Sequence, residues 1–232
     1  MSATRRRFHE ELEQLELDVL AMGELAEVAV GRSMDALIAH DDLLSKEVVD
    51  GDDEVDARYL SVEERTLQVL ALQTPVASDL RLLSVILHTN LHLERIADMA
   101  VNIAKIAHSV SDLPSTQTIL THLREMGDIV RPMVRTAMEA FGRRDLDLCL
   151  RLPEMDDPVD RLNLGMYQEV AALAGDEAAL NWGLRMLLVA RQLERVGDHA
   201  VDIGEQVGFL LTGEFREFSD ASHPFRNPAD AS

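Results

Sequence analysis

The chain has 232 residues, of which 47% are apolar and only 4% aromatic. Its formal net charge is −20, which excludes nucleic acid as a partner because binding to phosphate backbones is driven by Lys and Arg. The single cysteine, Cys149, excludes a disulfide or a thiolate metal site within one chain, and we expect it to be a small buried filler.

The spacing of apolar residues predicts six helices. Leu, Val, Ile, Ala and Met recur with a period near 3.6, which is typical of helices packed on helices. In chain order the predicted helices span about residues 5–39, 42–72, 75–110, 115–142, 145–174 and 176–212. Residues 214–232 contain Pro, Asn and Ser and are expected to be disordered.

No targeting or membrane segment is predicted. The basic start Arg5-Arg6-Arg7 is followed by charged residues instead of the apolar run of a secretory signal. No apolar run reaches the ~18 residues of a membrane span. We therefore expect a soluble cytoplasmic protein.

The two halves of the chain form a repeat. Met22-Gly23-Glu24 matches Met126-Gly127-Asp128 at an offset of 104 residues, and the segment 93–103 matches 193–203 at an offset of 100. The difference of four residues falls between the middle and last helix of the second half, where a loop tolerates a deletion. The sequence therefore predicts an all-α fold of two repeated antiparallel three-helix bundles, residues 5–112 and 115–213.

Acidic residues recur at equivalent positions of the two halves. The middle and the last helix of each half carry two acids spaced four residues apart, which places them on one stripe of a helix, and a further oxygen ligand follows the last pair. The candidate ligands are Asp52, Asp56, Glu94, Asp98 and Asn102 in the first half, and Asp156, Asp160, Glu194, Asp198 and Asp202 in the second. Antiparallel neighbouring helices bring each set together, and the helical angle from the apolar stripe predicts that the acids face outward.

Four clustered carboxylates need a counter-charge. Like charges four residues apart cost about 0.2–0.5 kcal/mol per pair, so arginine, water or a cation must offset them. One such pair is ordinarily a solvated face, and Arg95 and Arg195 can neutralise the acids in part. Four pairs at repeat-equivalent positions favour cations, and oxygen ligands favour Mg²⁺, Mn²⁺, Fe or Ca²⁺ over Zn²⁺, which is retained as a further candidate.

The candidate ligands of the two halves differ in two respects. Pro158 lies between Asp156 and Asp160, and a helix start or kink there would separate these two acids. Asn102 stands where the second half has Asp202, which makes the first set less acidic.

Three histidines lie near the candidate ligands. His199 can add a nitrogen ligand to the second set, but its equivalent is Met99, so we do not expect an essential role. His88 and His92 are spaced four residues apart and could ligate a metal together, but their equivalents are Leu188 and Gln192, which favours a local or core role.

No enzyme is predicted. A carboxylate-bridged di-iron enzyme is the catalytic alternative, but its Glu-x-x-His motif is absent because none of the eight histidines has a glutamate three residues before it. A phosphate-binding loop and a GxSxG elbow are also absent from the sequence.

The doubled Leu-Glu-Arg-[Ile/Val]-[Ala/Gly]-Asp motif, the stretch 75–81 (PVASDLR) and the two three-helix units resemble the PhoU family over about residues 8–213. These are accessory proteins of the phosphate-specific transport system, and their E(D)xxxD motifs bind metal ions. The resemblance implies metal binding by the four acid pairs given above.

The resemblance also implies a regulator and not an enzyme. Such a protein connects the ATPase subunit of the phosphate ABC transporter to a sensor histidine kinase, and keeps the phosphate-starvation response off when phosphate is plentiful. We also expect a homodimer that is only peripheral to membrane complexes. The alternative is a helical scaffold of the same fold, with solvated acids and no metal, that serves another transporter.

Overall fold

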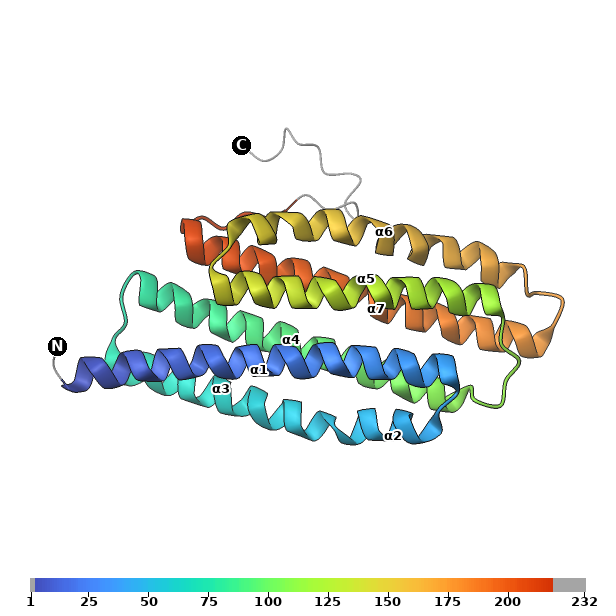
Figure 1. Cartoon of the computed structure of the whole chain (residues 1–232), viewed down its shortest axis with the longest axis horizontal. Helices are drawn as coiled ribbons and strands as arrows, with labels where there is room; N and C mark the ends of the chain where they lie inside the picture. Colours follow the sequence, from blue (N-terminus) through green and yellow to red (C-terminus); the bar gives the residue numbers. More distant parts are fainter. Residues whose placement is uncertain (1–2, 219–232) are drawn as a thin grey trace.

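A computed structural model describes residues 3–218 of the chain, and these residues form helices and connecting segments without any strand (Figure 1). The helices are α1 (Ala3–Ala39), α2 (Asp42–Asp50), α3 (Asp52–Gln73), α4 (Ser78–Ser109), α5 (Gln117–Arg143), α6 (Leu146–Ala171) and α7 (Glu177–Thr212). The predicted all-α fold of two three-helix bundles is confirmed, with α2 and α3 together forming the middle helix of the first half (Figure 1).

The repeat is visible at the start of each middle helix. Asp41 caps α2 by accepting hydrogen bonds from the two backbone N–H groups of Leu43 and Leu44, and Asp145 caps α6 in the same way. The residues just before these caps, His40 and Arg144, both have a left-handed backbone, with φ of 53° and 57°. Each pair is 104 residues apart, so the offset read from the sequence describes equivalent backbone positions.

Two helix boundaries in the first half differ from the prediction. The expected helix 42–72 is interrupted at Gly51, the residue type other than proline that least favours a helix interior. Gly51 keeps a helical backbone (φ −73°, ψ −13°), so α2 and α3 follow one another along the same edge of the bundle (Figure 1). The next helix begins at Ser78 and not near residue 75, because Thr74 and Ala77 have φ of 46° and 47° and form a turn.

The two halves pack against each other through α1 with α5 and α4 with α7, which leaves α3 and α6 at opposite edges (Figure 1). The packing of α1 on α5 is reciprocal. A Cβ on Gly23 would lie 2.6 Å from Cγ of Met138, and one on Gly127 would lie 3.2 Å from Cγ of Met34. Gly23 and Gly127 are repeat equivalents, as are Met34 and Met138, so the halves are related by an approximate two-fold axis.

One continuous apolar core runs through both halves. It contains Trp182 and Phe141, which are both fully buried, and Cys149, which is the buried filler that was predicted. Among residues 3–218, no helix is long and apolar enough to cross a membrane. The predicted domain boundary at residues 112–115 falls in the segment between α4 and α5.

The start of the predicted disordered tail follows α7. Residues 214–218 are not helical, but the Phe218 ring lies against Gly204 and Gly208, and its N–H donates to the Glu205 carboxylate at 2.6 Å. The Phe218 ring thus packs on α7 beside these two glycines, and the disorder expected for the tail stays a prediction. The rest of the predicted tail, residues 219–232, lies outside the described residues.

Candidate metal centres

The first acidic cluster lies between α3 and α4. We call it the first seam, and it comprises Asp52 and Asp56 on α3 with Glu94 and Asp98 on α4. Burial, together with the charges of Asp56 and Asp98, raises the pKa of Asp52. Burial and the charges of Asp98 and Asp56 likewise raise the pKa of Glu94. The carboxylates of both helices therefore act on one another, as the antiparallel arrangement predicted.

Groups of the protein itself offset part of the negative charge of the first seam, without a cation. Asp52 is the first residue of α3, where the helix dipole favours an acid. Lys105 lowers the pKa of Asp52 and Arg95 lowers that of Glu94, although neither effect outweighs burial and repulsion. Asn102 is exposed one turn beyond Asp98. This seam faces outward, as predicted.

The second acidic cluster lies between α6 and α7 and is more deeply placed. We call it the second seam, and it comprises Asp156 and Asp160 on α6 with Glu194 and Asp198 on α7. Asp156 is 2% exposed and Glu194 is 6% exposed, so the prediction that the acids face outward is wrong for these two residues. Burial, and then the Asp198 and Asp160 charges, raise the pKa of Glu194 to about 7. Burial and the Asp160 charge also raise the pKa of Asp198.

The deep position of Asp156 has a local cause. Gly197 occupies the position of Ala97 in the other half, and a Cβ on Gly197 would lie 2.2 Å from Oδ1 of Asp156. The missing methyl group therefore provides the space in which the carboxylate packs on α7. Pro158 does not begin the helix, because α6 runs unbroken from Leu146 to Ala171 with both of its prolines inside.

Glu194 is the acid of the second seam whose environment suits a cation best. Its Oε1 accepts a hydrogen bond from Arg191, whose side chain is 55% exposed. Its Oε2 is buried and has no hydrogen-bond partner among the described residues. A buried carboxylate oxygen without a donor is costly, and a cation shared with the neighbouring acids would satisfy it. The donors of both seams are oxygens, which suit hard cations such as Mg²⁺, Mn²⁺ and Ca²⁺.

Asp202, the last predicted ligand of the second half, faces a different set of residues. Its Oδ2 lies 3.3 Å from Nδ1 of His199 and 3.5 Å from Nδ1 of His92, while its charge still raises the pKa of Asp198. Burial lowers the pKa of His92 to about 4, against the opposing charge of Asp202. The contact between His92 and His199 was not predicted from the sequence, because these residues are 107 positions apart in the chain.

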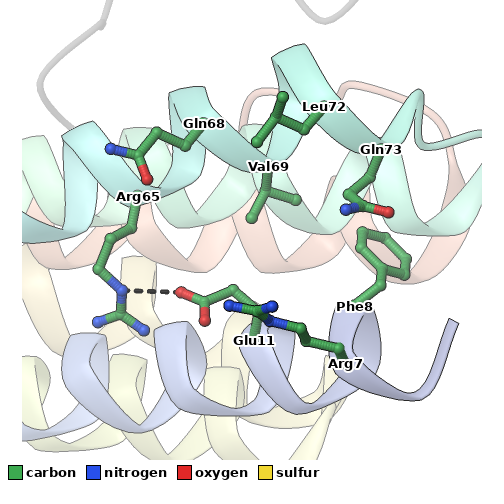
Figure 2. Close-up of a pocket in the computed structure, with 8 residues that line it drawn as sticks. All are labelled: Arg7, Phe8, Glu11, Arg65, Gln68, Val69, Leu72 and Gln73. Carbon is green, nitrogen blue, oxygen red and sulfur yellow. Dashed lines mark hydrogen bonds and ion pairs between the residues drawn. The ribbon is translucent and has the colours of Figure 1, made fainter. Parts of the chain in front are cut away.

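A groove on the described surface lies away from both seams. It has a volume of about 670 Å³ and lies between α1 and α3, where Figure 2 shows Phe8, Val69 and Leu72 beside the Arg65–Glu11 ion pair. Since α3 rises about 1.5 Å per residue, Val69 and Leu72 lie about 20–30 Å along the helix from Asp52 and Asp56. The groove therefore takes no part in the first seam.

The chain is similar to known proteins over most of its length. A family model described as the PhoU domain matches residues 19–107 and 123–207, and these two segments contain the first and the second seam. The chain is 35% identical to the phosphate-specific transport system accessory protein PhoU homolog of Pseudomonas putida, over 90% of this chain and 82% of that protein. It is 32% identical to the homolog of Caulobacter vibrioides, over 91% of this chain and 92% of that protein.

Solved structures agree with these similarities. The crystal structure of PhoU from Pseudomonas aeruginosa superposes with a TM-score of 0.85 at 35% identity, covering 89% of this chain and all (100%) of that one. The phosphate transport system regulatory protein PhoU from Streptococcus pneumoniae gives a TM-score of 0.84 at 25% identity, covering 91% and 100%.

Proposed function

This chain belongs to the PhoU family, and we propose from this that it is a metal-binding adaptor that negatively regulates phosphate uptake and the phosphate-starvation response. It acts in the cytoplasm, where it contacts the ATPase subunit of the phosphate transporter and a sensor histidine kinase. It has no catalytic activity of its own and works as a homodimer. Support for the transporter contact comes from the relatives, which are named as accessory proteins of the phosphate-specific transport system.

The environment of Glu194 is the observation that best supports metal binding. Its Oε2 is buried and finds no donor within residues 3–218, and burial and the neighbouring acids raise its pKa to about 7. The exposed guanidinium of Arg191 reaches only the other oxygen. A divalent cation between the acids of the second seam would supply the missing positive charge at close range.

The adaptor role is tested by capture from cells grown in high phosphate. The tagged wild-type protein is expected to recover both the transporter ATPase subunit and the kinase. Recovery of neither protein would contradict the adaptor role and favour the scaffold alternative.

Variants of the seam residues need a matched control elsewhere on the surface. This control is Glu125→Gln with Asp128→Asn, which we call the surface control, because both acids are exposed on α5.

A further inference from the structure

Three side chains with metal-ligating atoms meet where the two halves of the molecule pack together. They are His92 on α4 and His199 and Asp202 on α7. The Nδ1 atoms of the two histidines are 3.0 Å apart, and Oδ2 of Asp202 lies 3.5 Å from the first and 3.3 Å from the second. The three potential ligand atoms therefore form a small, nearly regular triangle.

The size of this triangle fits a single small metal ion. In a tetrahedral site with bonds of about 2.1 Å, two ligand atoms lie about 3.4 Å apart. The three separations, 3.0, 3.3 and 3.5 Å, are close to this value. One face of a tetrahedron is thus already formed by protein atoms, and a fourth position remains for water or another ligand.

The surroundings of the histidines also favour a cation. His199 is 8% exposed, so its imidazole lies largely out of solvent. The two facing Nδ1 atoms can share only one proton between them, whereas a metal ion accepts a lone pair from both. Asp202 is half-exposed and leaves a route for an ion from solvent.

The repeat provides an internal comparison, because all three positions differ together between the halves. The equivalents of His92, His199 and Asp202 are Gln192, Met99 and Asn102. The approximate two-fold axis therefore places Gln192, Met99 and Asn102 where the triangle has its three ligands, and no two of these side chains are good metal ligands. The difference affects both histidines and the carboxylate at once.

We propose that His92, His199 and Asp202 form a binding site for a divalent transition metal ion such as Zn²⁺. Two imidazoles and one carboxylate suit Zn²⁺, Co²⁺ or Ni²⁺, whereas the oxygen-only seams suit harder cations. Because His92 belongs to the first half and the other two ligands to the second, the ion joins α4 to α7 and ties the halves together. The site is independent of the metal binding proposed for the seams.

The test replaces the ligands with the residues of the other half. The triple variant His92→Gln, His199→Met and Asp202→Asn carries side chains that the fold already holds at the equivalent positions. Purified wild-type protein and variant are titrated with Zn²⁺, and the bound ion is examined by X-ray absorption. The control is His88→Gln, since His88 is exposed one turn earlier on α4 and its Nδ1 bonds the Ser84 carbonyl.

Wild type and the His88→Gln control are expected to bind one more Zn²⁺ per chain than the triple variant, with two imidazole nitrogens in the metal shell. Their Mg²⁺ binding should match that of the variant. A Zn²⁺ shell without imidazole in wild type would overturn the proposal, and this measurement needs no variant. An unchanged number of bound Zn²⁺ ions in a folded triple variant would also overturn it.

Discussion

Glu194 combines several opposing influences at one carboxyl group. Its side chain is buried between α6 and α7, two acids of the same seam repel its charge, and Arg191 attracts it from solvent. Burial and repulsion prevail, because the Arg191 guanidinium is largely hydrated and its charge is screened. In the absence of metal, ionisation of this group therefore opposes folding.

The raised pKa of Glu194 makes the stability of the metal-free protein depend on pH. The pKa of Glu194 is about 7 in the folded state, against an ordinary value of 4.5. Below pH 4.5 this carboxyl group is protonated in both the folded and the unfolded state, so it does not change the free energy of unfolding of the metal-free protein. Its ionisation lowers stability progressively as pH rises from 4.5 through 7. Glu194→Gln should remove this loss and raise the free energy of unfolding at pH 8 by on the order of 2 kcal/mol, with little change at pH 4.

Urea denaturation with a chelator, at pH 4 and pH 8, measures both values. The surface control should show no such gain at pH 8. A Glu194→Gln variant that is less stable than wild type at pH 8 would mean that the Arg191 ion pair outweighs the effects of burial.

The packing of α6 on α7 makes the second seam different from the first. Gly197 lets Asp156 approach the backbone of α7, whereas Ala97 carries a methyl group at the equivalent position of α4. The two seams therefore share a ligand pattern but differ in depth, and their metal affinities should differ as well.

Gly197→Ala tests this close approach. Alanine favours a helix over glycine by about 1 kcal/mol, so propensity alone predicts a more stable protein. We expect the opposite, a net loss of about 1 kcal/mol, because overpacking costs roughly 1–3 kcal/mol when the Asp156 carboxylate must move. Urea denaturation measures the difference, and a stabilised variant would show that the carboxylate moves freely.

Much of the fold could be predicted from the sequence because it depends on local patterns and on the repeat. Asp41 and Asp145 mark equivalent helix starts, and the apolar period locates the helices to within a few residues. The interruption at Gly51 was missed, because a glycine inside a periodic segment is compatible with either a continuous or a divided helix.

The candidate sites were predictable only in part. Spacing of four residues identified the acids of both seams, but burial of Asp156 depends on the absence of a methyl group on a neighbouring helix. The pairing of His92 with His199 depends on how the halves pack. Comparison of repeat-equivalent positions could not predict this contact, because His92 and His199 are not equivalent residues of the two halves.

At the scale of the whole molecule, the two bundles share one apolar core that extends from α1 to α7. We therefore propose that the halves at residues 5–112 and 115–213 are units of topology and not of independent stability. The metal-free protein should unfold in one cooperative transition, seen at the same urea concentration by circular dichroism and by Trp182 fluorescence. Two separate transitions would show that each bundle is stable alone.

We propose that both acidic seams bind cations. A cation at about 100 times its dissociation constant stabilises the folded state by about 2.7 kcal/mol. For a chain of this size each kcal/mol corresponds to ~2–4 °C in melting temperature. The most direct measurement is therefore the melting temperature with and without Mn²⁺, for wild type, the surface control and one double variant of each seam.

The double variants are Glu94→Gln with Asp98→Asn, and Glu194→Gln with Asp198→Asn. Both keep side-chain size and polarity while removing two charges. We expect Mn²⁺ to raise the melting temperature of wild type and of the surface control, and each double variant to lose part of this rise. If Mn²⁺ instead changes the melting temperature of none of the four proteins, the seams are solvated acidic faces and do not bind cations.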